Sequence, residues 1–101
     1  MTCRNCSILI VESEISPRVV RLQALLEEKG AETLVARSAE NALARGRQFV
    51  FAAALVNAEH RALARQLDIP VLLYASAEAP KMVVDGLERL LAVRRHSSLS
   101  D

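Results

Sequence analysis

The chain has 101 residues, of which 51% are hydrophobic, and its 13 Lys and Arg against 12 Asp and Glu leave a formal net charge of +1. This length suits one small globular domain, and the apolar share excludes an intrinsically disordered chain. The balanced charge and an aromatic share of 3% argue against nucleic-acid binding, which uses basic patches and aromatic stacking platforms. No run of roughly 20 apolar residues could span a membrane, and the N-terminal apolar run is too short for a signal peptide, so we expect a cytoplasmic protein without membrane contact.

Strand and helix patterns alternate from residue 7 onward. The β-branched apolar run SILIV at 7–11 is typical of a strand buried on both faces. A helix follows it, with Ser16 as its N-cap, Pro17 in its first turn and Gly30 after its end. Residues 31–37 then predict a second strand, and Ser38 caps a short helix over 39–48 that ends near Gly46.

The second half of the chain continues the same alternation. The patterns predict a third strand over 49–56, a helix over 58–67, a fourth strand over 69–75 and a last helix from Pro80 to His96. Strands that alternate with short helices predict an α/β fold in three layers, in which a parallel sheet is covered by helices on both faces. We divide the chain into an N-terminal extension (1–6), one domain (7–96) and a disordered tail (97–101).

In an open parallel sheet, ligands bind beyond the carboxyl ends of the strands. The residues at those ends are Glu12–Ser13–Glu14, Arg37–Ser38, Asn57 and Ala75–Ser76. Asn57 therefore lies where such a fold binds its ligands. By residue type alone, Asn57 could equally end a strand and cap the next helix, Glu12 could be a first-turn acid, and Lys81 could be a surface lysine.

Four segments carry a family resemblance: ILIVESE, LLEEKGAETLVARSAENAL, FVFAAALVNAE and IPVLLYASA. In order and character they resemble the receiver domains of two-component response regulators, over residues 7–91. The resemblance implies a flavodoxin-like sheet in the order 2-1-3-4, truncated to four strands because the chain is too short for the family's fourth helix and fifth strand. Truncation would leave the fourth strand as an exposed edge, so we expect a homodimer that covers it.

The resemblance also implies a phosphorylation pocket, and this chain departs from it at several positions. Asn57 matches the phosphorylated aspartate, Glu12 and Ser13 match the two acidic Mg²⁺ ligands, Ala75 matches a Ser or Thr, and Lys81 is a weak match for a lysine. A carboxamide is a poor nucleophile, and Mg²⁺ prefers carboxylate oxygens. We therefore predict a degenerate receiver domain that accepts no phosphate, uses no cofactor or Mg²⁺ and is not an enzyme.

A receiver-like surface without phosphorylation chemistry can still bind proteins. We predict an adaptor or inhibitor of a histidine kinase or a response regulator that acts by phosphorylation-independent contact. The resemblance places the kinase contact on the first helix, where Arg18 and Arg21 are the candidate residues. A regulator phosphorylated elsewhere, at Glu59 or Glu12, is an open alternative.

Cys3 and Cys6 form the motif CRNC ahead of the first strand. A Cys-x-x-Cys pair is typical of a redox site or of half a zinc site. A zinc site needs four ligands and the chain has no second pair, so His60, His96 or a second chain would have to complete it. We expect a reduced pair without metal, and a metal- or redox-sensing homodimer is the alternative function.

Overall fold

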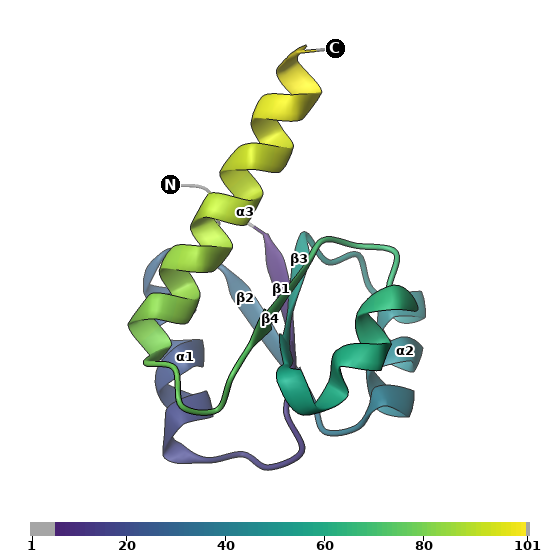
Figure 1. Ribbon diagram of the computed structural model, residues 1–101, viewed down its shortest axis with the longest axis vertical. Coiled ribbons are helices and arrows are strands. Elements are labelled where there is room, and N and C mark those ends of the chain that lie inside the picture. Colours follow the sequence, from purple (N-terminus) through teal and green to yellow (C-terminus); the bar gives the residue numbers. More distant parts are fainter. Residues whose placement is uncertain (1–5, 101) are drawn as a thin grey trace.

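The computed structural model describes residues 6–100, and the side chains of residues 6–92. Strands and helices alternate along it, as Figure 1 shows. The elements are β1 (Ser7–Val11), α1 (Pro17–Glu28), β2 (Glu32–Ala36), α2 (Ala39–Gln48), β3 (Ala53–Asn57), the 3₁₀ helix η1 (Ala58–Arg65), β4 (Val71–Tyr74) and α3 (Pro80–Ser100).

The four strands form one parallel sheet in the order β2-β1-β3-β4. Helices α1 and α3 cover one face of the sheet, and α2 and η1 cover the other (Figure 1). The predicted three-layer fold, its strand order and its truncation to four strands are thereby confirmed. Within the described residues β4 pairs with β3 alone, so it is an edge of the sheet.

The core consists of two apolar clusters, one on each face of the sheet. Ile8 and Ile10 of β1 point to the cluster under α1 and α3, whereas Leu9 and Val11 point to the cluster under α2 and η1. Because side chains alternate along a strand, a continuous apolar run supplies both clusters at once. This is why SILIV predicts a strand that is buried on both faces.

Helix boundaries follow the capping signals in the sequence. Ser16 Oγ accepts a hydrogen bond from Val19 N at 3.4 Å, and Ser38 Oγ accepts one from Asn41 N at 3.0 Å. Gly30 follows α1 with a φ of 90°, a conformation that glycine adopts without steric cost. These predicted starts and stops are confirmed, although α2 continues past Gly46 to Gln48.

The predicted third strand begins too early. Strand β3 starts at Ala53, which lies opposite Ile8, and Ala52 N donates to Ser7 O at 2.8 Å, so residues 49–51 extend beyond the pairing that β1 offers. The predicted helix over 58–67 is instead the 3₁₀ helix η1, which is kinked at His60 (φ −108°, ψ 28°). A 3₁₀ helix rises more per residue than an α-helix, so eight residues carry the chain back along the sheet.

Helix α3 continues to Ser100, and none of the described helices is long and apolar enough to cross a membrane. Residues 1–5, and with them most of the predicted extension, lie outside the described residues. The division into extension, domain and tail stays a prediction.

Candidate functional site

Asn57 is the centre of a hydrogen-bond network at the carboxyl ends of the strands. Only 3% of its surface is exposed, and the only other buried side chain with a polar group among the described residues is Tyr74, at 6%. Its Nδ2 donates to Glu12 Oε2 at 3.0 Å and to Ser76 Oγ at 2.8 Å. Its Oδ1 accepts from Glu59 N at 3.0 Å and so caps η1. The amide thereby uses both donors and its oxygen, which satisfies a buried polar group.

Glu12 accepts a second hydrogen bond at the same oxygen, from the hydroxyl of Tyr74. Burial, and then the hydrogen bond to Glu12 and the charge of Glu12, raise the pKa of Tyr74 well above its ordinary value. The phenol therefore stays neutral and serves as a donor. Two neutral donors from β3 and β4 thus hold the carboxylate that follows β1.

Ser13 faces η1 and not Asn57. Its Oγ lies 2.8 Å from Glu59 Oε1 and 2.8 Å from His60 Nε2, and these two atoms are 3.3 Å apart. Arg37 Nε donates to the carbonyl oxygen of Ser13 at 3.3 Å. The contacts with Glu59 and His60 hold the loop after β1 against η1, and the contact with Arg37 joins it to the segment after β2. They do not form a Ser–His–acid triad, because the serine and the carboxylate share one ring nitrogen of His60.

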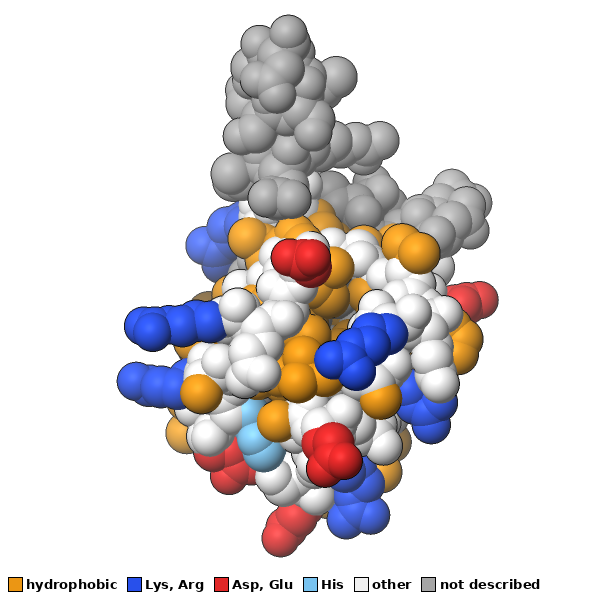
Figure 2. Space-filling model, turned by 90° about the vertical axis from the view of Figure 1, so that its right-hand side faces the viewer, with side chains coloured by type: hydrophobic (Ala, Val, Ile, Leu, Met, Phe, Trp, Pro, Cys, Tyr) orange, Lys and Arg blue, Asp and Glu red, His pale blue; other side chains and the backbone are white. Residues whose placement is uncertain are grey.

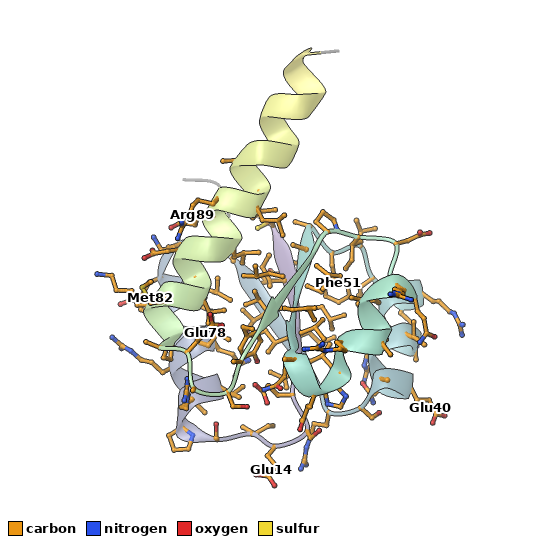
Figure 3. The ribbon with its side chains drawn as sticks, viewed as in Figure 1. Glu14, Glu40, Phe51, Glu78, Met82 and Arg89 are labelled. Carbon is orange, nitrogen blue, oxygen red and sulfur yellow. The ribbon has the colours of Figure 1, made fainter. Side chains whose placement is uncertain are left out.

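A hollow of about 220 Å³ opens beside the network, between the starts of α1 and α3. Figure 3 labels Glu14, in the loop after β1, and Glu78, in the segment before α3, which both line it. The other lining residues are Glu12, Ser16, Arg18, Val19, Leu22, Tyr74, Ser76, Pro80 and Val83. No group of three His, Cys, Asp or Glu side chains among the described residues is arranged to hold a metal ion.

The structure brings only some of the predicted pocket residues together. Glu12 and Asn57 are in contact, whereas Ser13 joins η1. Ala75 contributes its backbone N–H, which donates to Glu78 Oε2 at 3.0 Å. Lys81 is exposed in the first turn of α3 and does not line the hollow.

The other candidate residues lie in different places. Arg18 lines the hollow, and Arg21 is exposed on α1. Cys6 is partly buried and packs against the cluster under α1 and α3. Cys3 lies outside the described residues.

The sequence does not identify Tyr74 as a site residue, and it indicates Ser76 only as a residue at the carboxyl end of the fourth strand. The available signal was weak: Tyr74 is a polar aromatic residue at the end of a buried strand, and Ser76 follows one residue after Ala75. Their contact with Asn57 and Glu12 depends on the parallel register that sets Asn57 opposite Tyr74, which the sequence does not specify.

Comparison with known proteins finds no matching family model and no matching curated protein. Among solved structures, the receiver domain from the hybrid histidine kinase CckA matches with a TM-score of 0.68 at 17% identity, over 84% of this chain and 98% of that one. NtrX from Brucella abortus, in complex with ATP, matches with a TM-score of 0.70 at 18% identity, over 92% of this chain and 29% of that one. The fold is that of a receiver domain. Here the receiver fold is truncated to four strands, and Asn57 occupies the carboxyl end of the third.

Replacement of Asn57 by aspartate should destabilise the fold in a pH-dependent way. Asn57→Asp removes two donors and sets a carboxylate oxygen about 3.0 Å from Glu12 Oε2. One of the two carboxyl groups then has a raised pKa in the folded state. The loss of stability is therefore small below about pH 4 and grows to about 2 kcal/mol at neutral pH. Urea unfolding at acid and neutral pH measures it.

The matched control is Asn41→Asp, at an exposed position of α2. It should change stability by less than about 0.5 kcal/mol at either pH. An Asn57→Asp protein as stable as the wild type at neutral pH would contradict the network.

Tyr74 should resist ionisation until the protein unfolds. It is the only tyrosine, and the chain has no tryptophan, so the near-ultraviolet absorbance of tyrosinate reports this residue alone. Because the folded-state pKa is raised, the phenol stabilises the fold fully below about pH 10, and this contribution is lost as the pH rises further. Tyrosinate should appear together with the loss of circular dichroism. In urea the same residue should titrate near pH 10; tyrosinate in a protein that is still folded at that pH would contradict the expectation.

Proposed function

We propose that this chain is a receiver-like signalling module that binds a partner protein and is not itself phosphorylated. It acts as an adaptor or inhibitor of a histidine kinase or a response regulator. The observation that carries the proposal is the amide of Asn57, which is held against Glu12 at the carboxyl end of β3.

The contacts of Asn57 argue against phosphoryl transfer. The side chain is neutral, and its single oxygen already accepts from Glu59 N. A phosphoacceptor in this position needs an anionic oxygen that is open to the donor, and Mg²⁺ needs oxygen ligands around it. At Glu12, the oxygen that faces the network already accepts from Asn57 and Tyr74. These hydrogen bonds stabilise the negative charge of Glu12, which a bound cation would otherwise do.

The exposed side of α1 is the proposed partner surface. Arg18 and Arg21 are exposed there, and Val20 between them is 54% exposed. Arg18 and Arg21 are three residues apart and therefore lie on the same side of the helix, and two positive charges there suit a surface that is complementary to an acidic patch on a partner.

The edge of the sheet supports a homodimer as part of this proposal. Strand β4 lacks a second neighbour within the described residues, and Leu73 on it is 43% exposed. Two copies related by a twofold axis could pair their β4 strands in antiparallel fashion and cover both edges.

Partner binding should depend on α1 and not on phosphorylation. A partner captured from the native host and identified as a histidine kinase or response regulator would be re-measured with purified proteins. The double variant Arg18→Glu/Arg21→Glu should weaken the complex about tenfold or more, because it reverses both charges. Treatment with acetyl phosphate and Mg²⁺ should change neither the affinity nor the intact mass of the chain.

The matched control is Arg61→Glu/Arg89→Glu, at exposed positions of η1 and α3. It should leave the affinity for this partner within about twofold. A mass increase of one phosphoryl group, or an α1 double variant that binds as the wild type does, would refute the proposal.

The homodimer is tested by light scattering at micromolar concentration. The wild type should have twice the mass of the chain, and Leu73→Lys should have the mass of a monomer, because lysine blocks edge pairing. Val20→Lys, an equally drastic change on α1, should remain dimeric. A monomeric wild type would end the dimer proposal and leave the partner proposal intact.

A further inference from the structure

A second hollow, of about 400 Å³, lies on the face of the molecule that α2 and η1 cover. It lies at the amino ends of β3 and β4, whereas Asn57 lies at the carboxyl end of β3. We refer to its apolar lining as the α2/η1 groove, which consists of Leu43, Phe49, Val50, Phe51, Leu67 and Ile69.

Two of the apolar side chains that line the groove are largely exposed to solvent. Val50 is 93% exposed and Phe49 is 52% exposed, while Phe51 is almost buried beneath them. Phe49 and Phe51 are the only phenylalanines in the chain, and their rings pack edge to face with centroids 6.3 Å apart. Phe49 also lines a smaller hollow of about 160 Å³ with Leu34 of β2. Contiguous apolar surface of this kind marks interaction sites on soluble domains.

Two arginines lie at or next to this apolar surface. Arg47 of α2 lines the groove, and Arg65 lies in the last turn of η1, directly before the lining residues Gln66 and Leu67. Neither arginine forms an ion pair within the described residues, and Asp68 is the one acidic residue that lines the groove. Figure 2 shows this face, with hydrophobic side chains in its middle and Lys or Arg side chains on either side of them.

We propose that the α2/η1 groove binds an acidic, amphipathic segment of a partner protein. The apolar floor fits the apolar stripe of such a segment, and the arginines fit carboxylates along the edges of that stripe. A second copy of this chain suits the groove poorly, because a twofold contact would set these arginines against their own equivalents. The groove lies on the other side of the sheet from α1, so the proposal goes beyond the partner surface described above and gives the module two separate surfaces.

The test uses two synthetic peptides with leucine at the same helical positions, one with glutamate and the other with lysine at the exposed positions. Fluorescence anisotropy with the full chain should show that the acidic peptide binds at least about tenfold more tightly than the basic one. NMR shifts should be confined to α2, η1 and residues 49–51 and 66–69. Arg47→Glu/Arg65→Glu and Val50→Ser should each weaken binding about tenfold, and added salt should weaken it as well.

Matched controls lie on α3, on the opposite face of the sheet. Lys81→Glu/Arg89→Glu and Met82→Ser make the same kinds of change at exposed positions outside both proposed surfaces and should leave peptide binding unchanged. Equal affinity for both peptides, absence of saturable binding, or equal losses from the α3 variants would overturn the proposal. A dimer that Val50→Ser converts to a monomer would overturn it too, since a second copy would then occupy the groove.

Discussion

The complete burial of β3 is the constraint on which this structure depends. All five of its residues are buried between β1 and β4, and the last of them is the polar Asn57. A buried amide without partners would cost about 1–3 kcal/mol for each unmet group. The surrounding elements must therefore present acceptors and a donor to it. Glu12 after β1, Ser76 after β4 and the backbone of η1 do so.

The network that results joins the ends of three strands through side-chain hydrogen bonds. A carboxylate in a partly buried position needs compensation, and here neutral donors from Asn57 and Tyr74 provide it. Such a network holds one arrangement, because its central amide has both donors and its oxygen in use. A site that switches needs a group whose charge or ligation changes. The geometry thus suits a module that presents a fixed surface, which is the behaviour that we propose.

Much of this architecture could be predicted from the sequence because it rests on local signals. The run SILIV predicts a strand buried on both faces, and Ser16, Pro17 and Gly30 bound the first helix. Asn57 was placed at the end of the third strand on the same grounds. The contacts of Tyr74 and Ser76 depend instead on the register between β3 and β4, and the turn of Ser13 towards His60 depends on the kink in η1. Register and kink arise from tertiary packing, which a single sequence does not encode locally.

The residues that the sequence wrongly assigns to the start of the third strand are apolar and lie outside the sheet. The segment FVF at 49–51 has the composition of a strand. Pairing with β1 begins only after it, at Ala52 and Ala53, so these residues lie outside the sheet. Phe51 turns into the core, whereas Phe49 and Val50 remain on the surface beside α2 and η1. Strand-like apolar residues that the sheet does not use are therefore available to a partner. Since they lie at the amino end of the strands and Asn57 lies at the carboxyl end, a partner can occupy the groove while the Asn57 network stays intact.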